Sequence, residues 1–193
     1  MIDNLSDEYW NKRYVDGTTG WDLGEISPPI RAYVDQLNNK HLRILIPGSG
    51  NAHEATYLHQ KGFTDVHILD FAKDAVDVFL KNNPDFPKEQ AHVVNLFDFD
   101  AEFDLIIEQT LFCAIDPNLR ANYGQKTSEL LRKGGKLVGL LFNKEFLDGP
   151  PFGGNKAEYL DFFESFFDSI YMEECYNSIE PRQGGELFIR MVK

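Results

Sequence analysis

Hydrophobic and polar positions follow two different patterns along the chain. Short runs rich in Val, Ile and Leu are typical of buried strands, whereas apolar residues spaced three or four apart are typical of helices that pack by one face. The first pattern predicts strands at 42–47, 65–70, 91–96, 103–109, 136–142, 169–176 and 185–192. The second predicts helices at 5–15, 28–38, 52–62, 72–82, 117–133 and 155–167.

The order of these elements predicts an α/β fold. Strands that alternate with helices form right-handed βαβ units on a mostly parallel sheet, and the last two strands form an antiparallel pair. Pro117 suits a first helical position, and three glycines stand where helices would end: Gly62, Gly134 and Gly135. No repeat or linker divides the 193 residues, so we expect a single domain over 1–193. Ligands of such sheets bind at the carboxyl ends of the strands.

The segment "LIPGSGNAHE" places a glycine turn, Gly48 and Gly50, after the first strand. Glycine lets the backbone approach a ligand closely. Asp70 ends the second strand, where a carboxylate can accept both hydroxyls of a ribose. A dinucleotide site needs a third glycine where His53 stands, which argues against NAD. Ala52 takes the third position of the G-x-G-x-G turn of S-adenosylmethionine sites. Taken alone, the turn also fits a plain strand-to-helix connection.

The next two strand ends carry further chemistry. "LFDFD" places Leu96, Phe97 and Asp98 where they can pack an adenine and accept a hydrogen bond from its amino group. "EQTLFCAI" places Glu108 and Gln109 where the amino-acid end of such a cofactor would lie. Fitting chemistry at successive strand ends predicts a nucleoside cofactor.

The N-terminal segment is rich in aromatic residues. Trp10 and Tyr14 lie four apart, on one face of the predicted helix, and Trp21 follows in a glycine-rich loop. They can form a satellite hydrophobic cluster that packs the helix down. They can equally form a lid whose ring faces cover a cationic sulfonium and exclude water. Both interpretations stay open at this point.

Together these motifs resemble the thiopurine methyltransferase superfamily, especially its branch of thiol, halide and thiocyanate methyltransferases. The resemblance runs from residue 9 to 152 in the order of the family, through "YWNKRYVDGTTGWDLGEISP", "LIPGSGNAHEATYL", "ILDFA", "LFDF", "FDLIIEQTLFCAIDP", "LLRKGGKLVGLLF" and "GPPF". It implies a class I (Rossmann-like) seven-stranded methyltransferase sheet of order 3-2-1-4-5-7-6 with helices on both faces. It also implies an N-terminal helical lid at 1–38.

The resemblance further implies S-adenosyl-L-methionine as the cofactor. Carried over by position, the cofactor contacts fall on Trp10, Tyr14, Trp21, Gly48, Asp70, Leu96, Phe97, Asp98 and Gln109. Trp21 also lies where the family has an aromatic residue between cofactor and acceptor. Phe152, in the Pro- and Gly-rich segment 143–155, is expected to form a wall of the acceptor pocket. The thiopurine branch has arginine where this chain has Gln109, which favours the thiol and halide branch.

The expected reaction is methyl transfer to a small nucleophile: a thiol, thiolate, halide or thiocyanate. A model thiol has a pKa near 8.5, and halide and thiocyanate carry no proton, so we expect no dedicated catalytic base. The alternatives are methylation of a selenol or of a tellurium or selenium species, and cofactor binding without turnover. An NAD oxidoreductase is a more distant alternative.

The net charge limits the partners. A net charge of −12 argues against binding to nucleic acid, which requires clustered basic residues. It also disfavours binding to anionic membrane surfaces. The acidic, polar start predicts no secretory signal, and Cys113 and Cys175 have no metal-site spacing. We therefore expect a cytoplasmic monomer that binds a small-molecule acceptor, without nucleic acid, membrane or metal.

Overall fold

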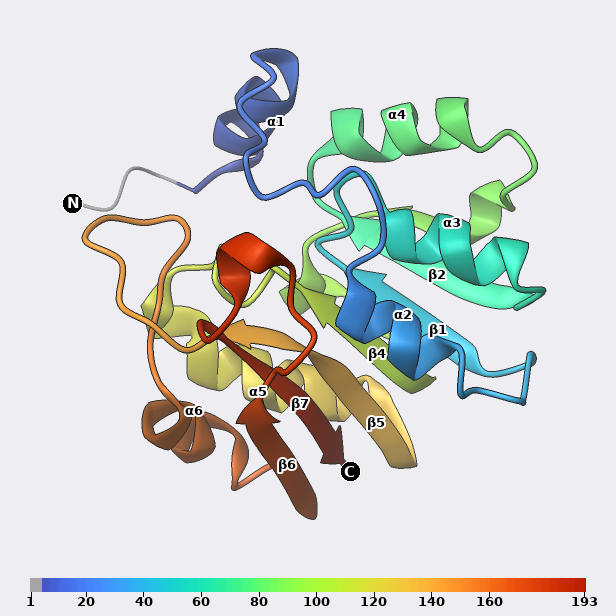
Figure 1. The fold of residues 1–193 in the computed structure, drawn as a ribbon. Coiled ribbons are helices and arrows are strands. Elements are labelled where there is room, and N and C mark those ends of the chain that lie inside the picture. The colour runs from blue at the N-terminus through green and yellow to red at the C-terminus, as the bar shows by residue number, and fades with distance from the viewer. Residues whose placement is uncertain (1–4) are drawn as a thin grey trace.

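A seven-stranded sheet forms the centre of the molecule, with the strand order β3-β2-β1-β4-β5-β7-β6 (Figure 1). The structure, a computed structural model, describes residues 5–193. Neighbouring strands are parallel from β3 to β5, and β7 is antiparallel to both β5 and β6. The predicted fold class and strand order are confirmed. The strands are β1 Arg43–Pro47, β2 Asp65–Asp70, β3 Ala91–Val93, β4 Phe103–Gln109, β5 Leu131–Phe142, β6 Ser169–Glu174 and β7 Glu186–Val192.

Helices cover both faces of the sheet. Alternate residues of β1 face opposite sides: Ile44 and Ile46 pack in one core cluster, and Leu45 packs in the other. The first cluster includes residues of α2, α3 and α4, and the second includes residues of α5 and α6 (Figure 1). The first helix, α1, packs against α4. The helices are α1 Asp7–Val15, α2 Pro28–Val34, α3 His53–Gln60, α4 Lys73–Asn82, α5 Arg120–Glu129 and α6 Lys156–Phe163.

The predicted helix at 117–133 is wrong at both ends. A 3-10 turn, η3 Pro117–Leu119, precedes α5, and the chain is already in β5 at Leu131. Gly134 and Gly135 therefore lie in a strand and cap no helix. Leu131 pairs with Phe103, and the register shifts before the next pair, which gives Gly134 a φ of +79°. This irregularity explains the two glycines.

Other predicted boundaries shift because local contacts end the elements early. Strand β3 stops at Val93, and the amide oxygen of Asn95 then accepts from the Phe97 N–H at 3.0 Å, starting the 3-10 turn η2 Leu96–Asp98. The predicted helix at 28–38 ends at Val34. Residues 1–4 of the predicted lid lie outside the described residues. Across residues 5–193, no helix is long and apolar enough to cross a membrane.

Candidate active site

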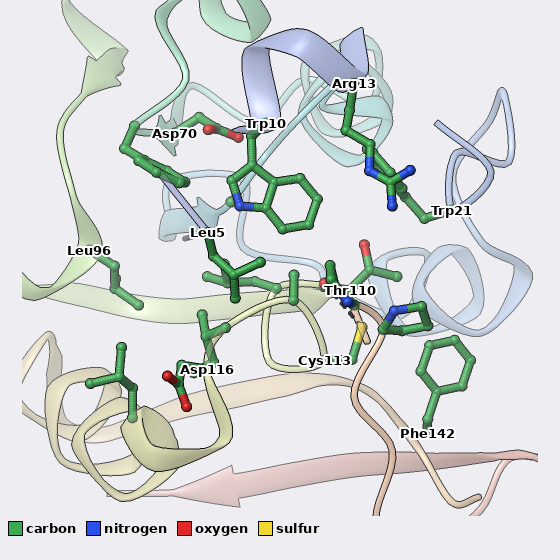
Figure 2. A pocket seen from close by; sticks show the side chains of 18 of the residues that line it. Leu5, Trp10, Arg13, Trp21, Asp70, Leu96, Thr110, Cys113, Asp116 and Phe142 are labelled. Atoms are coloured by element: carbon green, nitrogen blue, oxygen red, sulfur yellow. Dashed lines mark hydrogen bonds between the residues drawn. The ribbon is translucent and has the colours of Figure 1, made fainter. Parts of the chain in front are cut away.

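A cavity of about 760 Å³ lies at the carboxyl ends of the parallel strands (Figure 2). Seven residues predicted from the sequence line it: Trp10, Tyr14, Trp21, Gly48, Asp70, Leu96 and Phe97. A second cavity of about 50 Å³ shares Tyr14, Trp21 and Gly48 with the first and is also lined by Gln109. Eight of the ten predicted residues therefore meet at one place.

Two predicted residues lie outside both linings. Asp98 ends η2 with an exposed side chain. Phe152 lies next to Pro150 and Pro151, which do line the large cavity. Its own ring lies against Gly149, where an added Cβ would come within 2.2 Å of it. The roles of Asp98 and Phe152 stay predictions.

The glycine turn has the backbone that its residues suggest. Gly48 and Gly50 have φ values of +59° and +51°, and Ala52 also has a left-handed φ of 50°. A Cβ on Gly48 would come within 2.7 Å of the Leu111 side chain, so a larger residue would shift the wall of the cavity. Glycine is needed here for conformation and for close approach together.

Asp70 connects the turn to the cavity. Its carboxylate accepts hydrogen bonds from the backbone N–H groups of Gly50 and Ala72, both at 2.9 Å. A carboxylate has about four acceptor sites, so capacity remains for a ligand in the cavity that it lines. Burial raises the pKa of Asp70, and the backbone N–H groups oppose this rise. The side chain is 6% exposed.

Aromatic side chains from the N-terminal segment cover the cavity. Figure 2 shows the Trp10 indole projecting across it, with Arg13 and Trp21 to one side. Trp21 makes edge-to-face contacts with Trp10 and Tyr14, at centroid distances of 5.5 and 6.0 Å. The Arg13 guanidinium lies 5.7 Å from the Trp21 ring centroid. None of the four belongs to either core cluster of the sheet.

The loop between α1 and α2 is tied to the body of the protein by polar contacts. The Asp22 carboxylate pairs with His53 Nε2 at 2.7 Å and accepts from Asn51 Nδ2 at 2.5 Å. The Ser27 hydroxyl donates to the amide oxygen of Gln109 at 3.0 Å. These contacts hold the loop over the glycine turn.

Arg182, in the 3-10 turn η4 Glu180–Arg182, is a second anchor of this loop and lines the large cavity. Its Nη2 donates to the Trp21 carbonyl at 2.9 Å, and its Nη1 faces Glu186 at 3.3 Å. The guanidinium is 5.5 Å from the Phe142 ring centroid. The residue is only 9% exposed, so it places a buried positive charge beside the cavity.

Cys113 also faces the large cavity (Figure 2). Burial raises the pKa of its thiol to about 12, and the thiol donates to the Thr110 carbonyl at 3.2 Å. A thiol in this state is a poor nucleophile. Cys113 therefore forms part of the wall.

The loop at 143–155 is fixed against the same wall. The Phe152 N–H donates to the Cys113 carbonyl at 2.6 Å. The fully buried Arg120 donates to the carbonyls of Phe152 and Gly153, each at 2.9 Å. These bonds hold Pro150 and Pro151 at the edge of the cavity. Phe152 thus shapes the wall through its backbone.

A buried carboxylate supports the loop after β4. Glu108 accepts from the backbone N–H groups of Leu111 and Phe112, at 2.8 and 3.0 Å, and from the Tyr123 hydroxyl. Burial raises the pKa of Glu108 to about 7, although these bonds oppose the rise. The sequence placed Glu108 near the cofactor, but it is fully buried and lines neither cavity. Its contacts make it a support for Leu111.

Stability should therefore depend on the charge of Glu108. Between its ordinary pKa of 4.5 and about 7, the folded state holds the proton that the unfolded state has lost. The free energy of unfolding should thus fall as pH rises through this range, by about 3 kcal/mol from this group. Urea unfolding at several pH values measures the fall. Glu108→Gln keeps the shape without the charge and should remove this part of the dependence, and identical profiles would contradict the prediction.

Several residues at the cavities were not assigned from the sequence. No pattern in the sequence distinguishes Arg182 from the other basic residues, and Lys144 and Phe146 lie in the loop at 143–155. Phe142 is the last residue of β5. The acidic Asp22 and Glu54 line the small cavity. The motif "WDLGEISP" signals Asp22 only as part of the resemblance.

The chain matches the thiopurine S-methyltransferase (TPMT) family over residues 5–187. It is 31% identical to "Probable thiol methyltransferase 2" of Arabidopsis thaliana and 30% identical to "Thiocyanate methyltransferase 1" of Brassica oleracea. Each alignment covers 95% of this chain and 84% of the relative. A thiopurine S-methyltransferase of Vibrio cholerae is 25% identical, over 81% of this chain and 80% of its own.

Solved structures share the fold at low sequence identity. A 1,6-didemethyltoxoflavin-N1-methyltransferase of Burkholderia thailandensis, with its bound toxoflavin precursor and S-adenosylhomocysteine, has a TM-score of 0.73 and 16% identity, covering 98% of this chain and 87% of that one. A TehB-like S-adenosylmethionine-dependent methyltransferase of Corynebacterium glutamicum has a TM-score of 0.67 and 18% identity, covering 97% of both chains.

Proposed function

This chain belongs to the thiopurine S-methyltransferase family, and from that premise we propose that its acceptor is a thiolate, thiocyanate or halide. The enzyme is an S-adenosylmethionine-dependent methyltransferase that acts on a small nucleophile. Its two most similar named relatives among those above are a thiol and a thiocyanate methyltransferase. Gln109, where the resemblance places arginine in the thiopurine branch, supports the same choice.

The residues of the two cavities fit the cofactor. Asp70 is a buried carboxylate with acceptor capacity beyond its backbone bonds, as two ribose hydroxyls require. Leu96 and Phe97 offer an apolar surface for adenine, and Gln109 lies in the small cavity beyond the glycine turn. The rings of Trp10 and Trp21 suit a sulfonium cation. We propose these residues as the cofactor contacts, and this convergence on one site is the observation that carries the proposal.

The protein residues act by orientation and by exclusion of water. When bound, the cofactor supplies an electrophilic methyl group on a sulfonium sulfur. The lid covers the cavity, and the loops after β4 and β5 form its opposite wall. Orientation of two reactants can lower a barrier by about 7–11 kcal/mol. Because a thiolate, thiocyanate or halide already carries its negative charge, no residue has to remove a proton.

We propose that Arg182 binds the anionic acceptor. Its guanidinium is buried, lines the large cavity and contacts Trp21, which stands between the proposed cofactor and acceptor regions. Arg13 and Lys144 also line this cavity. They place positive charge locally in a protein whose net charge is −12. The attraction of an anion to these close, partly desolvated cations outweighs its repulsion by the distant surface carboxylates, because salt screens the distant charges more strongly.

Replacing Arg182 with methionine should raise the KM for thiocyanate or iodide by at least about tenfold, because one charge-assisted contact is lost. Steady-state kinetics measures the change, and urea unfolding reports any damage from the lost bonds to Trp21 and Glu186. Lys144→Met removes an exposed cation of the same cavity and is the matched control. Equal effects of both variants would contradict the special role of Arg182.

The first experiment is to measure S-adenosylhomocysteine formation with a panel of acceptors. The panel contains hydrosulfide, an aromatic thiol, thiocyanate, iodide, a selenol and a thiopurine. Turnover should be highest with a thiol, thiocyanate or iodide. A clear preference for the thiopurine would refute the proposed acceptor class. Cofactor binding without turnover of any acceptor would refute this class too and leave a binding protein.

We also propose that the enzyme works as a cytoplasmic monomer. Cys113 and Cys175 are both buried free thiols, which suits a reducing compartment. Size-exclusion chromatography with light scattering tests the oligomeric state.

A further inference from the structure

Glu54, in the first turn of α3, is a buried carboxylate. Among the described residues, no other residue forms a hydrogen bond or an ion pair with its side chain. Glu54 is 6% exposed. Within residues 5–193, the one hydrogen-bond donor to its carboxylate is its own backbone N–H. Buried charges are costly unless they are paired. Burial accordingly raises the pKa of Glu54. Such a group calls for a partner from outside the chain.

The surroundings of Glu54 indicate what this partner is. Glu54 lines the small cavity together with Asp22, Glu25 and a single basic residue, His53, which pairs with Asp22. The cavity therefore favours a cation. It is about 50 Å³, room for a compact group such as an ammonium. The hydroxyl of Ser49, in the same lining, is buried and has no hydrogen-bond partner within residues 5–193.

We propose that Glu54 binds the α-ammonium group of the cofactor, and that the Ser49 hydroxyl binds the same amino-acid end. The inference rests on the proposed cofactor site, since the small cavity adjoins the large one at Tyr14, Trp21 and Gly48. An unpaired carboxylate and an unpaired hydroxyl in one small cavity suit a group that carries both an ammonium and a carboxylate.

The test compares two ligands that differ only by the amino-acid group. S-adenosylhomocysteine carries it, and 5′-methylthioadenosine has the same nucleoside and a thioether without it. Glu54→Gln should weaken S-adenosylhomocysteine binding at least about tenfold in calorimetry, because a charge-assisted hydrogen bond is lost. Binding of 5′-methylthioadenosine should change less than about twofold. Glu129→Gln, which removes an exposed carboxylate of α5, should leave both affinities unchanged.

Urea unfolding separates this role from a structural one. Removing an unpaired buried charge should leave the free energy of unfolding unchanged or higher, while binding falls. Equal loss of affinity for both ligands, or no loss for either, would overturn the proposal. If the wild-type protein binds both ligands, such a result leaves the proposed function standing. If it binds neither, the proposed function and this inference fail together.

Discussion

Replacing Asp70 with alanine should weaken S-adenosylhomocysteine binding by at least about a hundredfold. Hydrogen bonds to a charged group contribute about 1.5–3 kcal/mol each, and two ribose hydroxyls would lose their acceptor together. The variant also leaves the N–H groups of Gly50 and Ala72 without their bonds, which adds to the loss by loosening the glycine turn. Isothermal titration calorimetry measures the affinity.

A pair of ligands separates these two contributions. The wild-type protein should bind 5′-methylthioadenosine more tightly than its 2′-deoxy analogue, because the analogue lacks one hydroxyl for Asp70. The Asp70→Ala variant should no longer distinguish the two. A variant that keeps wild-type affinity, or that still prefers the ribose, would remove Asp70 from the ribose contact.

Replacing Trp21 with alanine should lower kcat by about a hundredfold while the fold persists. A misplacement of the reactants by about one ångström can cost this much in rate. Trp21 contacts Trp10 and Tyr14, and such aromatic pairs contribute about 0.5–1.5 kcal/mol each. Single-turnover kinetics and urea unfolding, on the same preparation, measure the two effects.

The same variant decides between the two interpretations of the aromatic N-terminus. A fall in kcat with a modest loss of stability supports the lid. A loss of several kcal/mol in the free energy of unfolding, with kcat nearly unchanged in the folded fraction, supports a packing cluster. Trp21→Phe keeps an aromatic face and the backbone bond to Arg182, so it should retain most of the activity.

The sequence was sufficient for the sheet and for the residues at its strand ends. The apolar runs of β1, β2 and β4 are short and bounded by turns. Strands β2 and β4 end at the site residues Asp70 and Gln109, and β1 ends one residue before Gly48. Parallel strands bring these ends to one edge, so the order of the strands is enough to place residues together that lie far apart in the chain.

The limits of sequence reasoning are also physical. The start of β5 at Leu131 depends on pairing with Phe103, a long-range contact that local helix propensity cannot register. Arg182 reaches the cavity from a 3-10 turn without a periodic pattern. Glu54 lies in the first helical turn, where an acidic residue is ordinary, and only its burial without a partner distinguishes it among the described residues.

The bond between Arg182 and the Trp21 carbonyl joins positions 161 residues apart. During translation, the ribosome releases Trp21 long before Arg182 is made. Strand β7, which lies between β5 and the edge strand β6, follows Arg182 in the chain. A nascent chain that stops before Arg182 has the glycine turn and Asp70 but lacks this anchor of the Trp21 loop. The contact that holds the Trp21 loop can therefore form only after Arg182 has been synthesised.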